Sequence, residues 1–311
     1  MQLADKIYGN ESVRDALLRA VHEDRLCHAY LFYGEEGIGK KTLASWFAKL
    51  ILCESPHAEG ACGHCQACRS VESETHPDLY IAPYDKPLPV AAVREIKQRS
   101  FVKPNSGRYN VFIIPQADRM EGPSFNALLK VLEEPPGNTV FLLTAADKAT
   151  TPQTISSRCI PITVQTLHKS QLKDMLISRT DADEARIEQA IRIADGNPGK
   201  ALRLLTDPEQ IAALQTASAL YEAICRRKEY VFLQLTQSKI GDKQKFILVN
   251  DLLKNKLHDE LLSGGKISGL KISELSEMIR YCQKVSGMLR KPFSMNLMSA
   301  GYAAGIFAQI K

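Results

Sequence analysis

The segment LFYGEEGIGKKTLASWF, residues 31–47, constrains the fold more than any other part of the chain. An apolar run leads into a glycine-rich turn, a lysine and then a helical pattern, which is the layout of a phosphate-binding loop. Such loops read G-x-x-x-x-G-K-[ST], but here Lys41 stands at the hydroxyl position and Thr42 follows one residue late. The candidate nucleotide-binding residues are Gly34, Gly37, Gly39, Lys40, Lys41 and Thr42.

Short apolar segments alternate with helical patterns through the first half of the chain, which predicts a parallel sheet covered by helices on both faces. The predicted strands are residues 29–33, 78–83, 109–114, 139–144 and 159–164. Beyond about residue 165 the patterns are helical only. We expect three domains: an α/β domain over residues 1–165, a small helical domain over 166–207 and an all-α domain over 208–311.

Four cysteines, of which the first ends the helix predicted over residues 42–53, have the spacing C-x8-C-x2-C-x2-C within residues 53–68. Four closely spaced thiolates suit tetrahedral zinc, and a closed set of four ligands indicates a structural site. The segment is too small and polar to form a core of its own, so a metal would supply its folding energy. Four reduced cysteines without a metal are the alternative, and His64 could replace one thiolate. The predicted zinc ligands are Cys53, Cys62, Cys65 and Cys68.

Composition narrows the class of protein only slightly. The net charge of +5 is compatible with a nucleic-acid partner but common in other proteins. No signal peptide is evident, and no apolar run reaches the roughly 20 residues of a membrane span. Residues 295–310 come nearest and predict a buried helix instead. We therefore expect a cytoplasmic protein, in which cysteines serve as metal ligands or free thiols. Basic residues surround one loop, and a solvated face is their default interpretation: Lys97, Arg99, Lys103 and Arg108.

The sequence lacks the groups that nucleotide hydrolysis requires. Mg²⁺ normally binds the hydroxyl after the loop lysine and an acidic residue at the end of another strand. Lys41 is a cation, and the strand VFII ends in Pro115 and Gln116, which offer no carboxylate. Asp118 follows three residues after Pro115 and is expected to lie beyond reach of the loop. The loop is therefore predicted to hold ATP or ADP without hydrolysis.

With these pieces in place, the sequence resembles the subunits of the bacterial DNA polymerase III clamp loader, most closely the delta-prime type. The resemblance covers about residues 1–205 and is carried by HAYLFYG, the four-cysteine segment, THPDLYIAP, FNALLKVLEEPPGNTVFLLT and TISSRCIPI. It implies an AAA+ module with a helical lid and a C-terminal oligomerisation collar. The implied partners are gamma or tau and delta subunits in a five-subunit ring, the sliding clamp and primed DNA, without a membrane.

The resemblance also implies roles for two positions. In the segment SSRC, Arg158 matches an arginine finger that reaches the ATP site of the adjacent subunit. An ordinary surface arginine is the alternative. Gly199 stands where the ATP-hydrolysing gamma or tau type carries a nucleotide-sensing arginine in its lid. This departure and the missing strand-end acids favour the delta-prime type, with its own ATPase activity lost.

Two other functions remain open at this point. The first is an active gamma-type or tau-type ATPase that uses Thr42 and Asp118 unconventionally. The second is a zinc-dependent nucleic-acid-binding module with a vestigial phosphate loop.

Overall fold

The computed structural model describes residues 7–83, 88–147, 149, 151–266, 268–289 and 294–310. The chain divides into two compact units. One contains Met1–Met175 with Gly196–Lys200, and the other contains Leu176–Asp195 with Ala201–Lys311. The three domains predicted from the sequence stay a prediction, because the structure divides into two units, each made of two separate segments of the chain.

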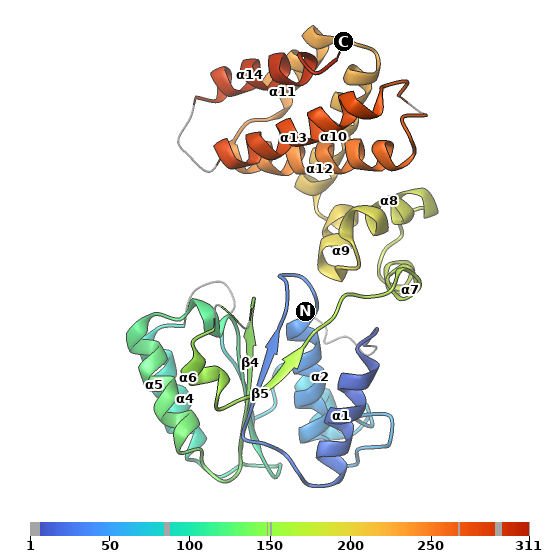
Figure 1. The fold of residues 1–311 in the computed structure, drawn as a ribbon. Coiled ribbons are helices and arrows are strands. Elements are labelled where there is room, and N and C mark those ends of the chain that lie inside the picture. Colours follow the sequence, from blue (N-terminus) through green and yellow to red (C-terminus); the bar gives the residue numbers. More distant parts are fainter. Residues whose placement is uncertain are drawn as a thin grey trace. The chain divides into compact units, whose positions relative to one another are not determined.

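A parallel sheet of five strands forms the centre of the first unit (Figure 1), as the alternating pattern predicts. Its strand order is β2-β3-β4-β1-β5, and each neighbouring pair is parallel. The strands are β1 Ala29–Tyr33, β2 Leu79–Ile81, β3 Asn110–Ile114, β4 Thr139–Ala145 and β5 Ile160–Thr163. The helices are α1 Glu11–His22, α2 Lys40–Leu52, α3 Gln66–Glu72, α4 Val90–Ser100, α5 Gly122–Glu133 and α6 Gln153–Ser156, with a 3₁₀ helix, η1, at Ala117–Arg119. A further helix, α7 Lys169–Arg179, begins in the first unit and ends in the second.

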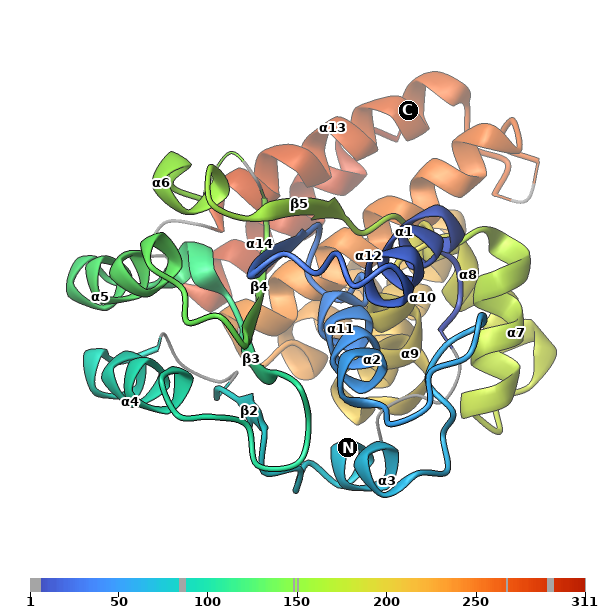
Figure 2. The ribbon, with the colours of Figure 1, turned by 90° about the horizontal axis from the view of Figure 1, so that it is seen from below.

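Helices cover both faces of this sheet, which explains why its central strands are apolar throughout. Figure 2 shows α1, α2 and α3 on one side and α4, α5 and α6 on the other. Tyr30 and Phe32 point into the first core, and Leu31 points into the second, because successive side chains of a strand alternate. In the first core, Tyr30 meets Phe47 of α2 edge to face, with ring centroids 5.0 Å apart. Full burial of such a side chain stabilises the fold by roughly 1.5–3 kcal/mol.

The sequence patterns did not predict three short elements: α3, α6 and η1. Each spans seven residues or fewer, which is too short for helical periodicity to be visible. Local contacts define them instead. Helix α3 begins after Cys65, whose sulfur accepts a hydrogen bond from the N–H of Cys68.

A buried carboxylate, Asp78, fixes the basic loop between α4 and β3. It accepts hydrogen bonds from the backbone N–H groups of Asn105 at 2.6 Å and of Ser106 and Gly107 at 2.9 Å. Burial would raise the pKa of Asp78, but these donors outweigh it and lower the pKa to about 2. On this loop, Arg108 pairs with Asp24 at 2.9 Å. That pairing agrees with a solvated charged face.

Helices make up the second unit in the described part of the chain. They are α8 Glu184–Ala194, α9 Pro198–Thr206, whose first turn belongs to the first unit, α10 Pro208–Cys225, α11 Glu229–Lys239, α12 Lys243–Leu262, α13 Ile272–Met288 and α14 Met295–Phe307. Tyr302 of α14 is fully buried between the rings of Phe232 and Phe246. The predicted buried helix is only half buried, because α14 packs through one face and leaves Leu297 76% exposed. Among the described residues, no helix is long and apolar enough to cross a membrane.

Candidate functional site

The glycine-rich loop joins the carboxyl end of β1 to the amino end of α2, as the sequence predicts. Gly39 caps α2 in a left-handed conformation, with a φ of 105°. The Lys40 Nζ donates hydrogen bonds to the carbonyl oxygens of Gly34 and Glu35, the latter at 2.8 Å. Burial lowers the pKa of Lys40, and nearby carboxylates oppose that shift. The lysine is therefore folded onto the loop whose amides would hold a phosphate.

The end of β3 carries no group that binds Mg²⁺. Pro115 is buried, and the N–H of Gln116 donates to the Thr144 Oγ1 at 3.1 Å. Lys41 and Thr42 lie in the first turn of α2 and are half-buried. The fold therefore brings the loop residues together, but it places no carboxylate at the end of β3 to bind Mg²⁺ beside them.

Asp118 acts on the loop more directly than the sequence suggested. Its charge is the largest of the charges that raise the pKa of Lys40, so it does affect the loop lysine. The Asp118 Oδ2 accepts a hydrogen bond from the N–H of Ala146 at 2.9 Å, while Oδ1 is buried and has no hydrogen-bond partner in the described structure. The sequence did not suggest this effect, because the position of Asp118 relative to Lys40 depends on the tertiary fold.

A close contact between two glycines explains why position 199 has glycine instead of a nucleotide-sensing arginine. The N–H of Gly199 donates to the Gly37 carbonyl at 2.9 Å, and the Asn197 Nδ2 donates to the Glu36 carbonyl at 2.9 Å. A Cβ on Gly199 would lie 2.7 Å from the Gly37 carbonyl oxygen, which is closer than such contacts permit. The start of α9 therefore packs backbone to backbone against the phosphate loop, where any side chain at position 199 would not fit.

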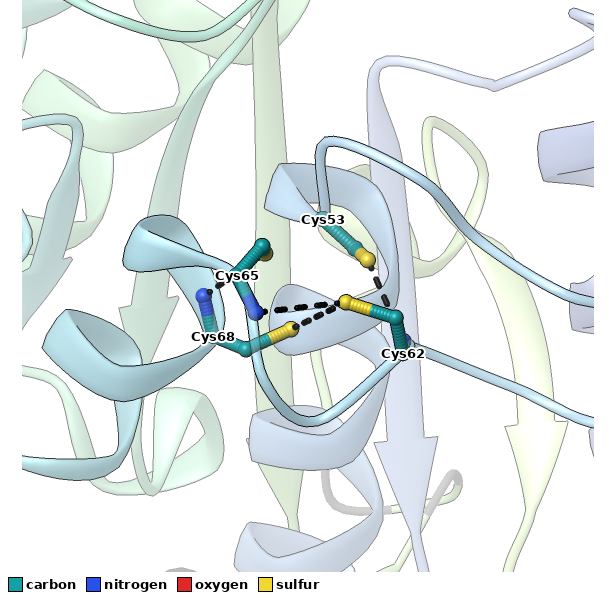
Figure 3. A group of neighbouring side chains, drawn as sticks. All are labelled: Cys53, Cys62, Cys65 and Cys68. Atoms are coloured by element: carbon teal, nitrogen blue, oxygen red, sulfur yellow. Dashed lines mark hydrogen bonds between the residues drawn. The ribbon is translucent and has the colours of Figure 1, made fainter.

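The four predicted metal ligands converge on one point (Figure 3), between the end of α2 and the start of α3. Their sulfur atoms all lie within 4.8 Å of one another. Backbone N–H groups support the thiolates: Cys62 donates to the Cys53 sulfur at 3.2 Å, and Cys65 donates to the Cys62 sulfur at 3.4 Å. A four-sulfur set of this kind fits a tetrahedral metal ion with no open position for water.

The surroundings of the sulfur cluster distinguish ligands from bystanders. A hydrogen bond from the N–H of His64 lowers the pKa of the Cys62 thiol to about 6, which favours the thiolate that a metal binds. Burial raises the pKa of Cys68, so that thiol needs a cation to ionise. The ring of His64 is exposed and lies 2.9 Å from the Cys62 carbonyl oxygen through Nδ1, which leaves the four cysteines as the ligand set.

Arg158 lies just before β5, beside a pocket of about 480 Å³. Its Nη1 donates to the Thr154 carbonyl at 2.9 Å, and its Nη2 donates to the Glu133 Oε1 at 2.8 Å. The same pocket is lined by His28, whose Nε2 is buried and lacks a hydrogen-bond partner among the described residues. Sequence reasoning did not single out His28, although it directly precedes a predicted strand.

Arg158 and Lys40 lie at opposite ends of the sheet. β1 and β5 are parallel neighbours, with Tyr30 opposite Ile160. Arg158 therefore sits at the amino end of these strands, whereas the phosphate loop follows their carboxyl end. A strand of five residues spans about 16 Å at roughly 3.3 Å per residue. The guanidinium is too far away to act at the phosphate loop of its own chain.

Comparisons with known proteins identify the family of the chain. Residues 9–168 match the model of the family described as DNA polymerase III, delta subunit. The chain is 36% identical over 170 residues to the tau/gamma subunit of DNA polymerase III from Haemophilus influenzae, across 55% of this chain and 25% of that one. It is 35% identical over 181 residues to the delta' subunit from Pseudomonas aeruginosa, across 57% of this chain and 55% of that one.

A solved structure supports the fold along nearly the whole chain. A protein related to the DNA polymerase III gamma subunit, from Thermotoga maritima, superimposes with a TM-score of 0.57 at 15% identity, covering 95% of this chain and 99% of that one. By contrast, the chain spans only a quarter to about half of the length of the two curated relatives. The structural likeness shows the AAA+ fold of the clamp-loader proteins, and the matched sequence shows the family.

Proposed function

The chain belongs to the DNA polymerase III delta-subunit family of clamp-loader proteins, and on this premise we propose that it is a delta-prime type subunit that does not hydrolyse ATP itself. In this role it helps the complex open the sliding clamp and place it on primed DNA. Its own contribution to chemistry is Arg158, donated to the ATP site of a neighbouring subunit.

One observation carries this proposal: Arg158 and the phosphate loop lie at opposite ends of the same parallel strands. If this arginine acts on a nucleotide, that nucleotide belongs to another subunit, because Arg158 cannot reach the loop of its own chain. In a ring, the amino end of one sheet can face the nucleotide of the next subunit. A guanidinium placed there would stabilise the charge that develops on the transferring phosphoryl group.

The loop region supports a non-hydrolysing subunit over a gamma-type or tau-type motor. Lys41 replaces the hydroxyl that binds Mg²⁺, and Pro115 and Gln116 replace the strand-end acids. The close approach of Gly199 to Gly37 excludes a sensing side chain at that position. Relatives of both types match at similar identity, so these residues carry the distinction.

A gamma-type or tau-type ATPase is the second candidate, and Asp118 favours it. The buried, unpartnered Asp118 Oδ1 could coordinate a cation near Lys40, in place of the missing strand-end acid. In either case the loop holds ATP or ADP, and Zn²⁺ bound by the four cysteines has a structural role. The partners in either case are gamma or tau and delta type subunits in a five-membered ring.

Reconstitution tests the proposal. The chain is mixed with gamma or tau and delta type subunits from the same organism, and assembly is followed by sedimentation. ATP-dependent loading of the clamp onto primed DNA is measured with this chain present or omitted. We expect one stable complex, and loading that falls to background without the chain. Normal assembly and loading in its absence would contradict the proposed role.

A further inference from the structure

We propose that Glu133 is a positioning residue for Arg158, which fixes the direction in which the guanidinium faces the neighbouring site. This inference rests on the proposed function, because it assigns Arg158 a target outside the chain. Glu133 is the last residue of α5, and its carboxylate accepts from the Arg158 Nη2 at 2.8 Å.

Two separate elements hold the guanidinium from two sides. The Arg158 Nη1 donates to the Thr154 carbonyl of α6 at 2.9 Å and to the Ser157 Oγ at 3.2 Å. Glu133 of α5 holds the other nitrogen. An arginine side chain has five N–H donors in one plane. These three hydrogen bonds fix that plane and leave two N–H groups without a partner among the described residues, available to a phosphate oxygen.

The ion pair is placed to orient Arg158 rather than to stabilise the fold. The side chains of Arg158 and Glu133 are 34% and 47% exposed, and ion pairs this accessible contribute little to stability. An unrestrained arginine side chain samples many rotamers, and ordering it costs conformational entropy. Glu133 and Thr154 meet that cost before the subunits assemble. Preorganisation of this kind raises the rate at a site without changing how tightly the substrate binds.

The sequence offers a matched control. Glu134 follows Glu133 directly and lies at the C-terminal end of α5, but among the described residues Arg158 forms its ion pair with Glu133. Glu133→Gln and Glu134→Gln therefore remove the same charge from adjacent positions. Glu133→Asp keeps the charge but withdraws it by one methylene.

The experiment measures ATP turnover by the complete complex, assembled with each variant of this chain and with Arg158→Ala. In single-turnover measurements, Glu133→Gln is expected to slow hydrolysis at the site that Arg158 faces about 5- to 20-fold with unchanged ATP binding, because the finger acts in the transition state. Glu133→Asp should fall between Glu133→Gln and the original chain, and Glu134→Gln should match the original. The melting temperature of the isolated chain should be the same for all of them, which a structural role of the ion pair would not give.

The outcomes separate this inference from the function on which it rests. If Arg158→Ala slows turnover and Glu133→Gln does not, Glu133 has no positioning role and the inference is wrong, while the finger stands. If Arg158→Ala itself leaves turnover unchanged, both the finger and its positioning residue are wrong. An equal loss in Glu133→Gln and Glu134→Gln would also overturn the inference, since it would reflect charge near the interface rather than the contact.

Discussion

Replacement of Arg158 by alanine in the assembled complex is expected to abolish rapid ATP hydrolysis at the site that this arginine faces. Arginine fingers of other nucleotidases contribute about 10³–10⁵ in rate, because the guanidinium neutralises charge that spreads over the phosphoryl oxygens. Single-turnover phosphate release from the complex measures the effect directly. The affected site should appear as a missing fraction of the fast phase, while nucleotide binding and assembly stay normal.

Two further variants test whether the loss of fast hydrolysis is specific to the guanidinium of Arg158. Arg158→Lys should recover little of the rate, because an ammonium cannot reproduce the planar fork that reaches several oxygens. Arg25→Ala removes an equally charged side chain that is 81% exposed and pairs with Glu23, so it should leave the fast phase intact. A full fast phase in the Arg158→Ala complex would show that this arginine does not act at a neighbouring site.

Removal of the zinc ion that we propose for the four cysteines is expected to unfold the segment from Cys53 to the end of α3 while the sheet stays intact. The segment has no core of its own, because its buried Val71 packs into the core on one face of the sheet. Structural zinc contributes roughly 10–16 kcal/mol of binding free energy in small zinc-binding peptides. Without that contribution, amide hydrogen exchange across residues 54–72 should accelerate by about 100-fold or more. Mass spectrometry of exchange before and after chelation gives the result, with the metal content measured on the same samples.

The cysteines themselves provide the control for this effect. Cys65→Ser should lose the metal and reproduce the fast exchange, because it removes one thiolate ligand while the serine hydroxyl can still cap α3. Cys27→Ser changes an exposed cysteine outside the cluster and should keep one zinc per chain. Slow exchange in a metal-free chain would mean that the four sulfurs are brought together by the fold alone.

The order and direction of the main elements could be predicted from the sequence because their signals are local. Apolar runs bounded by turn residues mark the strands, and Gly39 and Lys40 mark the start of α2. The short helix α3 could not be predicted, since its position depends on the sulfur cluster and on the capping sulfur of Cys65. The sequence predicted a helix over residues 295–310, and α14 ends earlier, at Phe307. Its half-exposed packing depends on which neighbours cover it.

In the candidate site, too, some features could be predicted from local sequence and others depend on the tertiary fold. The four cysteines and the loop residues lie close in the sequence, so their spacing already predicts their chemistry. The contacts of Gly37 with Gly199 and of Arg158 with Glu133 join residues 162 and 25 positions apart in the sequence and depend on the tertiary fold. Asp118 is the plainest case, because its charge raises the pKa of Lys40 although the two residues are far apart in the sequence.

The central claim is that this chain serves a neighbour's ATP site and does not hydrolyse ATP at its own. Turnover of ATP by the purified chain alone, compared with its Lys40→Ala variant, tests that claim most directly. The absence of a Mg²⁺-binding hydroxyl and of strand-end acids predicts the same background rate for both proteins. A measurable rate that disappears in Lys40→Ala would contradict the account and would assign catalysis to the loop, with Asp118 as its missing acid.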